Sequence, residues 1–292
     1  MSEVSSPIDT LLKSDWEYSL SDNPEFSSQA GFHQHSTKLQ DLSPAAFQAR
    51  LVHDRQVLTE VKQLLQTPEG KDSLALQLLE QDLANEIASF ELGTHLYPVN
   101  SIGYGGVVNN FIEALEWLPD TEEEGFVARL EAFPAQVTGY ISLLQAGLDA
   151  NEVASQAMVR KVETQLQEVI DALAPVVSSN DDQGDSKQRE NDHLINQRLA
   201  KLTSESLQTR GNLAKSIFRD SIINLKEFFT AKYIPKARPQ TGCGGLPNGN
   251  GEAVYAQCLA FHTTTKLSPQ EVHVCSDNPL IPLSSPSLNH VL

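Results

Sequence analysis

The sequence predicts an all-α protein, a multi-helical lobe of antiparallel helices that ends in an irregular C-terminal tail. Apolar residues recur mostly at intervals of three and four, which places them along one side of a helix. Residues that begin and end helices stand at the edges of these stretches. No run of β-branched and aromatic residues alternates over the length that a strand needs. No fixed-period repeat is present, so a regular solenoid is not expected.

Caps and prolines set the expected boundaries of the helices. Ser43 is expected to cap a helix that has Pro44 in its first turn. Thr121 and Glu124 match a capping box, and Pro134 is expected to begin or kink a further segment. The expected helices run over 44–66, 74–90, 107–118, 121–133, 134–147, 159–173, 194–207 and 213–229. Trp16, Trp117 and the phenylalanines are expected in the core.

Composition and charge exclude some classes of partner. The 292 residues are enough for two domains or for one large helical unit, and 40% hydrophobic with 20% charged residues is typical of a globular protein. With 21 Lys and Arg against 38 Asp and Glu, the formal net charge is −17 and the pI is about 4.8. This charge repels phosphate backbones and anionic lipid surfaces, so neither nucleic acid nor a membrane is an expected partner.

The compartment is inferred from cysteine content and from the N-terminal stretch. Three scattered cysteines, Cys243, Cys258 and Cys275, do not form a disulfide framework in a chain of this length. The first twenty residues lack a basic region followed by an apolar region, and no apolar run reaches about 18 residues. The sequence therefore predicts a cytoplasmic protein.

The most specific motifs lie between Tyr233 and His273. A turn, Leu246-Pro247-Asn248-Gly249, precedes a helix that carries Tyr255, then His262-Thr263-Thr264 and the helix start Leu267-Ser268-Pro269-Gln270-Glu271-Val272-His273. In this order the motifs resemble the family known as domain of unknown function 885, DUF885. Trp16, the stretch 21–26, Gly31 and the stretches 42–44 and 97–100 look like the earlier parts of that family, so the resemblance covers roughly 16–273.

The resemblance implies a largely helical fold similar to that of gluzincin-type zinc metallopeptidases. In that family the metal ligands lie on a downstream His-Glu-x-x-Pro-Gly-His helix. None of the eight histidines here is followed by Glu. Without that pair the chain lacks the usual zinc ligands and the carboxylate that acts as general base. No catalytic residue, metal ligand or cofactor is therefore expected, and zinc is expected only for full-length family members.

The C-terminal end predicts a helix that stops early. Ser268, Pro269 and Glu271 form a strong helix start, but Asp277-Asn278-Pro279 ends the helix after about two turns. We therefore expect a helical lobe over 1–275 with a mobile loop at about 178–190, followed by a divergent, disordered tail over 276–292. An alternative exon, a frameshift or a misassigned gene end after about His273 is the corresponding hypothesis.

Candidate substrate contacts cluster at the end of the Tyr-bearing helix. Polar groups beside a glycine turn often face a cleft, which selects five residues. They are Tyr255, His262, Thr263, Thr264 and Asn248. The alternative is a satisfied helix C-terminus, in which the hydroxyls bond the last free carbonyls. A zinc site built from Cys258, His262, His273 and Cys275 is conceivable, but its spacing matches no standard module.

These observations favour a truncated, non-catalytic helical lobe of a metallopeptidase-like protein of a hydrolase family. The competing hypothesis is a helical protein-interaction module, whose partner would be a peptide or another protein. A hydrolase with an unrecognised site is the third hypothesis, and a cluster of buried carboxylates with perturbed pKa values would favour it.

Overall fold

The computed structural model describes residues 6–99, 106–174, 193–239, 241–242, 245–246 and 249–277, with side chains described up to His273. In these ranges the chain is all-α, which confirms the predicted fold class. The helices are α1 (Pro7–Asp22), α2 (Pro24–Gln29), α3 (Pro44–Leu64), α4 (Leu74–Glu91), α5 (Val107–Glu116), α6 (Glu123–Asp149), α7 (Gln156–Val159), α8 (Val162–Ala172), α10 (Leu194–Lys201), α11 (Glu205–Phe228), α12 (Gly251–Thr263) and α13 (Pro269–Asp277). Three shorter turns are η1 (Thr94–Leu96), the π-helical η2 (Phe229–Tyr233) and η3 (Ile234–Lys236).

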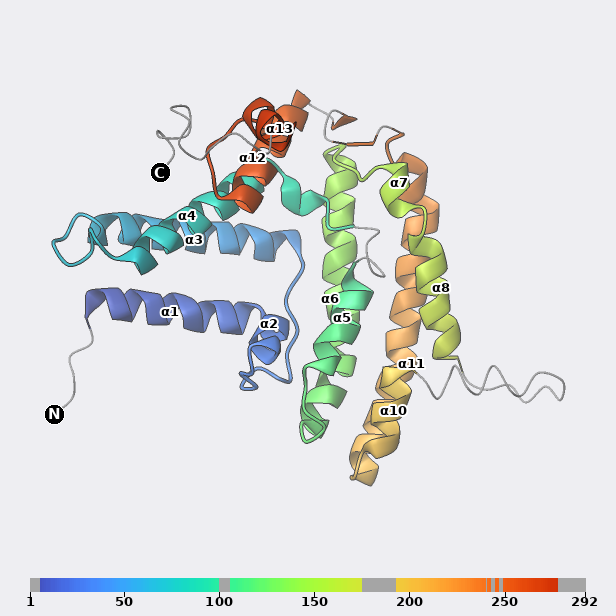
Figure 1. The fold of residues 1–292 in the computed structure, drawn as a ribbon. Coiled ribbons are helices and arrows are strands. Elements are labelled where there is room, and N and C mark those ends of the chain that lie inside the picture. Colours follow the sequence, from blue (N-terminus) through green and yellow to red (C-terminus); the bar gives the residue numbers. More distant parts are fainter. Residues whose placement is uncertain are drawn as a thin grey trace, which may run out of the picture.

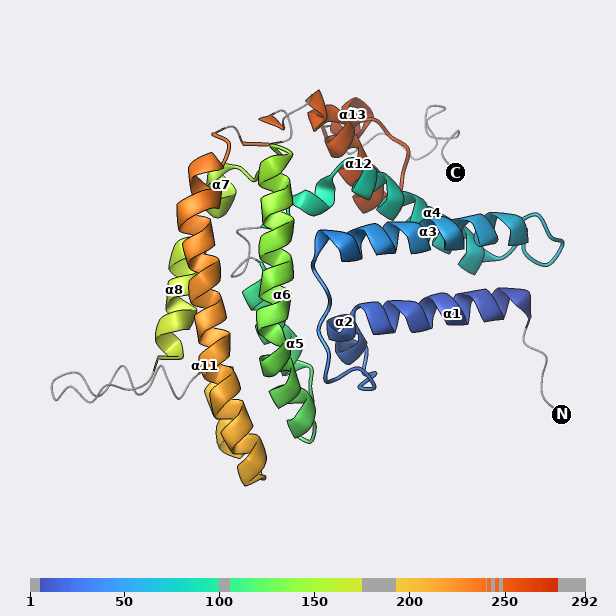
Figure 2. The ribbon, with the colours of Figure 1, turned by 180° about the vertical axis from the view of Figure 1, so that it is seen from behind.

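The helices form two groups that run in different directions (Figure 1). The central bundle consists of α5, α6, α8 and α11, whose long helices run side by side (Figures 1 and 2). The N-terminal hairpin consists of α1, α3 and α4, which lie across the direction of the bundle, and α12 packs on α4. In the described ranges the strand signal is limited to one isolated bridge between Ser155 and Arg238.

The core of the central bundle is large and aromatic. Phe111 of α5, Phe133 of α6 and Phe218 of α11 are at most 1% exposed, and their ring centroids lie 4.4 to 5.0 Å apart. The apolar residues of the expected 159–173 helix are all buried in this core, although the chain divides there into α7 and α8. Burial of this seam confirms the amphipathic pattern.

The N-terminal hairpin has a separate and smaller core. Its buried residues are Leu11, Val57, Val61, Leu76 and Leu83. Large apolar side chains of the same region remain in solvent, among them Leu74, which is 67% exposed. Trp16, expected in the core, is 41% exposed and packs edge-on against Phe26 and Phe32.

A buried arginine on α6 holds α2 and the segment before α3 against the bundle. Arg129 is fully buried and donates hydrogen bonds to the carbonyls of Lys38, Ala114 and Pro24 at 3.2, 3.0 and 2.8 Å, and to the Ser28 hydroxyl at 2.7 Å. No carboxylate lies within ion-pair distance of it in the described residues. Burial lowers the pKa of this guanidinium to about 10, so it stays charged at neutral pH.

A glycine of α6 lets the connector to the hairpin come close. A Cβ atom at Gly139 would lie 3.0 Å from the backbone nitrogen of Ser43, directly before α3. The Ser43 hydroxyl in turn accepts a hydrogen bond from the N–H of Ala46, which confirms the predicted cap. The start of α3 is therefore held both locally and by the bundle.

A second buried arginine caps the C-terminal end of α5. Arg198 of α10 donates to the carbonyls of Leu115 and Leu118 at 2.7 and 2.8 Å, and its guanidinium carbon lies 4.8 Å from the centroid of the Phe126 ring. Arg129 reaches the carbonyl of Ala114 on the same turn. The carbonyls at a helix C-terminus carry partial negative charge, so two buried cations stabilise this end.

The predicted helix start at Pro134 and the predicted capping box at Thr121 are wrong. The helix runs unbroken through Pro134, because Phe133 and Val137 beside it are buried. An internal proline costs about 3 kcal/mol, and burial of two large apolar side chains contributes about as much or more. The capping box at Thr121 is also absent, since the helix begins at Glu123 and the Glu124 carboxylate binds Arg210 at 2.9 Å.

The predicted helix over 194–207 is interrupted. It ends at Lys201 as α10, and α11 begins at Glu205. Leu202 between them is extended and buried, and the N–H and hydroxyl of Thr203 donate to the Glu123 carboxylate at 3.1 and 3.0 Å. These tertiary contacts outweigh the local helical pattern.

The helix start at Ser268 is confirmed. The Ser268 N–H donates to the Glu271 carboxylate at 2.8 Å, and the Glu271 N–H donates to the Ser268 hydroxyl at 3.3 Å, which completes a capping box. The expected tail over 276–292 begins inside α13, which includes Ser276 and Asp277, and its remainder from 278 onward lies outside the described residues, as does the expected loop at 178–190. None of the described helices combines the length and apolar character that a membrane crossing requires.

Candidate functional site

The predicted substrate contacts lie on α12 and directly after it. Tyr255 and His262 are seven residues apart on this helix, so they share a face, and both are exposed. Asn248 lies outside the described residues. The structure therefore brings Tyr255, His262 and the two threonines to one helix, and their role as substrate contacts stays a prediction.

The hydroxyls of the two threonines bond the end of α12. Thr263 donates to the carbonyl of Leu259 at 2.8 Å, and Thr264 donates to the carbonyl of Thr263 at 2.7 Å. Thr264 has a φ of 53°, the left-handed conformation that often ends a helix. These contacts correspond to the satisfied helix C-terminus that the sequence offered as the alternative.

The residues proposed for a zinc site do not converge in the described part of the chain. Cys258 and His262 lie one turn apart on α12, and His273 lies on α13. The Cys275 side chain is outside the described set. Among the residues that the structure describes, no three His, Cys, Asp or Glu side chains are placed to hold a metal ion.

The helix that carries Tyr255 lies beside a pocket that sequence patterns did not indicate. The Gln257 amide of α12 donates to the carbonyl of Asn85 on α4 at 3.3 Å. The next residue on α4, Glu86, lines a pocket of about 260 Å³ between α3, α4 and η1. We call it the α3/α4 pocket, and it is lined by Phe47, Arg50, Leu51, Asp54, Glu86, Ser89, Phe90, Thr94 and His95.

Two carboxyl groups in the α3/α4 pocket have raised pKa values. Desolvation raises the pKa of Asp54 from 3.8 to about 6, and the charge of Glu86 adds to the shift. Desolvation also raises the pKa of Glu86, with a further contribution from Asp82. A carboxyl group with a pKa near 6 can hold or release a proton close to neutral pH.

A cation and an imidazole complete the pocket. Arg50 donates to Asp22 at 2.7 Å and to the carbonyl of Asp41 at 2.6 Å, while its Nη1 has no partner in the described residues. His95 stacks on Phe90 with ring centroids 4.1 Å apart, and burial lowers its pKa. Its Nδ1 is buried and also without a partner in the described residues. The pocket thus combines two carboxyl groups with raised pKa values and two buried nitrogen atoms that have no hydrogen-bond partner in the described residues.

Sequence reasoning missed these residues because no local motif marks them. Phe47, Arg50, Leu51 and Asp54 follow helical spacing, so Asp54 shares a helix face with two large apolar residues. A carboxylate in such a position is a signal of partial burial. Glu86 and His95 have no comparable signal, because only the packing of α4 and η1 on α3 brings them there.

Comparison with known proteins gives one family. Residues 24–277 match the family model described as "Bacterial protein of unknown function (DUF885)". No curated protein matches the chain. The matched range includes α2 through α13 and both the α3/α4 pocket and the predicted contacts on α12.

Proposed function

Since the chain belongs to the DUF885 family of bacterial proteins, we propose that it is a non-catalytic helical lobe of a metallopeptidase-like protein of a hydrolase family. The observation that carries the proposal is that none of its eight histidines is followed by Glu. A zinc peptidase of the type that the sequence resembles needs this pair for metal binding and for general base chemistry. The proposed lobe is cytoplasmic and acts on a peptide or a partner protein through binding alone.

The test measures metal and turnover on the same purified chain. Mass spectrometry after exposure to zinc and removal of excess metal should find far less than one ion per chain, and peptidase assays should find no turnover. A stoichiometric metal together with turnover would refute the proposal. If zinc is bound, its loss in Cys258→Ser or His262→Ala would show that α12 supplies ligands. Ser268→Ala is the control, because it alters only the cap of α13.

A second candidate, the interaction module, is favoured by exposed apolar side chains. Leu213 and Ile217 lie one turn apart on α11 and are 64% and 43% exposed. A strip of this kind on a helix is typical of a surface that another protein covers. Light scattering of the full chain at increasing concentration tests self-association, which Leu213→Lys should abolish. A monomer at every concentration would argue against a second copy as the occupant.

The third candidate, a hydrolase with an unrecognised site, is favoured by the raised pKa of Asp54. If the α3/α4 pocket performs hydrolysis, turnover should fall on one side of about pH 6 and should be lost in Asp54→Asn. Wild type and Asp54→Asn are screened side by side on ester and peptide substrates. If the pocket is the active site, only the wild-type chain hydrolyses a substrate, whereas a contaminating enzyme would give equal rates in both preparations.

A further inference from the structure

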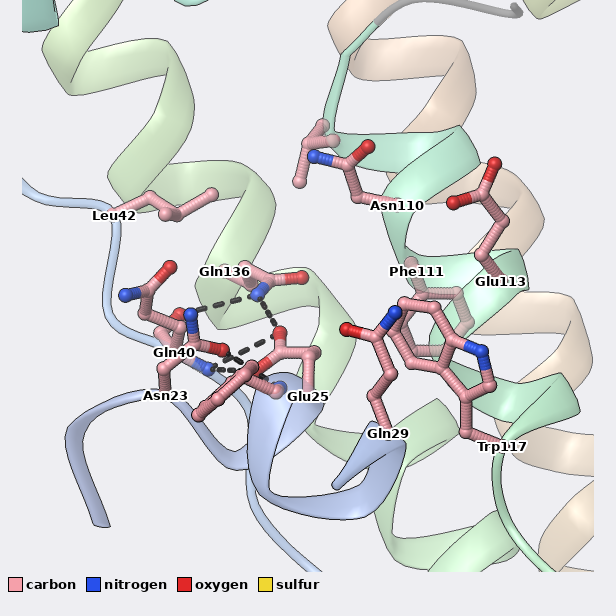
Figure 3. A pocket seen from close by; sticks show the side chains of 12 residues that line it. Asn23, Glu25, Gln29, Gln40, Leu42, Asn110, Phe111, Glu113, Trp117 and Gln136 are labelled. Carbon is pink, nitrogen blue, oxygen red and sulfur yellow. Dashed lines mark hydrogen bonds between the residues drawn. The ribbon is translucent and has the colours of Figure 1, made fainter. Parts of the chain in front are cut away.

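A second pocket lies where α2, α5 and α6 meet (Figure 3). Its volume is about 270 Å³, enough for a small organic molecule rather than for a large cofactor. The polar residues of its lining include Glu25 of α2, Asn110 and Glu113 of α5, and Gln136 of α6. Trp117, which is half-buried, provides aromatic surface. We call it the α2/α5/α6 pocket.

Gln136 is buried in the lining of this pocket, and only the nitrogen of its side-chain amide forms hydrogen bonds in the described residues. The residue is 8% exposed, and its Nε2 donates to Glu25 Oε1 at 2.7 Å and to the carbonyl of Gln40 at 3.1 Å. Its Oε1 is buried and has no partner among the described residues. In Figure 3 this oxygen points away from Glu25, toward the side where Asn110 and Phe111 lie.

The orientation of the amide follows from its neighbours. Both groups that contact Nε2 are acceptors, so a flipped amide would place its oxygen against a carboxylate and a carbonyl. A buried acceptor without a donor costs free energy, and such groups are uncommon in folded proteins. The unused oxygen therefore indicates a molecule that supplies an N–H or O–H donor.

The charge of the lining selects among such molecules. Glu25 and Glu113 are the charged residues of the lining, and neither forms an ion pair in the described part of the chain. The Glu25 carboxylate accepts from the Gln40 N–H at 3.0 Å, and Glu113 accepts from the Asn109 amide at 2.6 Å. The buried Arg129 interacts electrostatically with Glu25, but its hydrogen bonds go to three carbonyls and to a hydroxyl.

We propose that the α2/α5/α6 pocket binds a primary alkylammonium group. An N–H of the ammonium donates to Gln136 Oε1, and Glu25 and Glu113 balance its charge. The alkyl chain lies against Trp117, whose ring face also attracts cations. Anions are repelled by the two carboxylates, and quaternary ammonium ions cannot donate to the buried oxygen. This binding activity is independent of the proposed absence of peptidase chemistry.

The direct test is calorimetric titration of the full chain with three small probes. Saturable binding of n-butylammonium is expected. Tetramethylammonium, which has the charge but no N–H, should bind at least about tenfold more weakly, as should 1-butanol, which has a donor but no charge. In a parallel NMR titration the indole N–H signal of Trp117, which lines the pocket, should shift.

A fourth probe distinguishes a free amine from a side chain of a peptide. N-acetyl-lysine methylamide carries the same ammonium group on a peptide unit. Tighter binding than n-butylammonium assigns the site to lysine side chains of a peptide partner, and weaker binding assigns it to free amines. Both results support an ammonium site, whereas failure of both ammonium probes to bind would overturn it.

Variants place the binding in this pocket. Gln136→Met should weaken n-butylammonium binding by about tenfold or more, because it removes the buried acceptor. Glu113 is exposed, so Glu113→Gln should leave the fold intact and weaken binding by about threefold. Glu116→Gln is the matched control, with the same charge change on α5 outside this lining. An equal loss in Glu113→Gln and Glu116→Gln would show nonspecific attraction and overturn the assignment.

Discussion

The central bundle and the N-terminal hairpin are stabilised in different ways. The bundle buries a continuous core around Phe111, Phe133 and Phe218. The hairpin has a core of five buried residues and leaves several large apolar side chains in solvent. Hydrogen bonds of Arg129 and Gln136 hold α2 and the segment before α3 on the bundle. Hydrophobic burial therefore stabilises the bundle, and directional polar contacts fix α2 and the segment before α3 on it.

The largest effect is expected in the core of the bundle. Phe218→Ala should lower the free energy of unfolding by about 4 kcal/mol, because it removes a fully buried ring and leaves a cavity between two others. Denaturant unfolding monitored by circular dichroism measures the change. Phe32→Ala, at a ring that is 42% exposed, is the control and should cost far less. Similar losses in both variants would contradict the central position of the aromatic cluster.

The second-largest loss of stability is expected where α2 and the segment before α3 meet α6. Arg129→Met should cost about 3 kcal/mol, because carbonyls of Pro24, Lys38 and Ala114 lose their buried donor. Hydrogen exchange should accelerate in α2 more than in α11. Arg55→Met removes an arginine whose ion pair with Glu91 is exposed, and it should cost less than about 1 kcal/mol. Uniform acceleration in both regions would mean that α2 and the bundle unfold as one unit.

A smaller effect is expected inside the hairpin. Leu76→Ala should cost about 2 to 3 kcal/mol, near the lower end for buried leucines, because few other residues surround it in the small core. Leu74→Ala on the same helix is the matched control, since that side chain is 67% exposed. Thermal unfolding measures both variants. A Leu76→Ala loss as large as that of Phe218→Ala would remove the difference between the two cores.

The smallest effect depends on pH. The pKa of Asp54 is raised from 3.8 to about 6, so the folded state binds the proton more tightly than the unfolded state. This contribution is fully present below about pH 4 and is lost as the pH rises through about 6. Asp54→Asn should therefore stabilise the protein at pH 7 by about 1 kcal/mol, a value reduced because solvent reaches the side chain.

The measurement is denaturant unfolding of wild type and Asp54→Asn at pH 4 and pH 7. The difference between them should be much smaller at pH 4, where the carboxyl group is protonated in the folded state and partly protonated in the unfolded state. Asp72→Asn is the control at an exposed carboxylate and should show no such pH dependence. An Asp54→Asn variant that is less stable than wild type at pH 7 would contradict a desolvated carboxylate.

Local signals predicted the helices and failed where long-range contacts compete with them. The caps at Ser43 and Ser268 are confirmed because each depends on atoms within three residues. The break at Pro134 is wrong because the burial of its neighbours is a tertiary effect. The exposure of Trp16 could not be predicted either, since the sequence does not say how much of the hairpin other helices cover.

The residues of the candidate sites also divide into those that local sequence indicates and those that only packing brings together. The sequence selected Tyr255, His262, Thr263 and Thr264, which lie together because they belong to one helix and its end. Gln136 shares the buried stripe of α6 with Arg129, so a polar residue among apolar positions could have drawn attention to it. The contact of Gln136 with Glu25, 111 residues away, has no sequence signal.

The amino-acid sequence by itself determined the helical class, most helix starts, the family and the lack of a His-Glu pair, because these depend on neighbouring residues or on identity alone. Only the tertiary structure decided which polar groups lose water. Desolvation depends on all the atoms that surround a group, and helices distant in sequence supply most of them. The raised pKa of Asp54 arises from that packing, and so does the burial of the Gln136 oxygen, which has no partner among the residues that the structure describes.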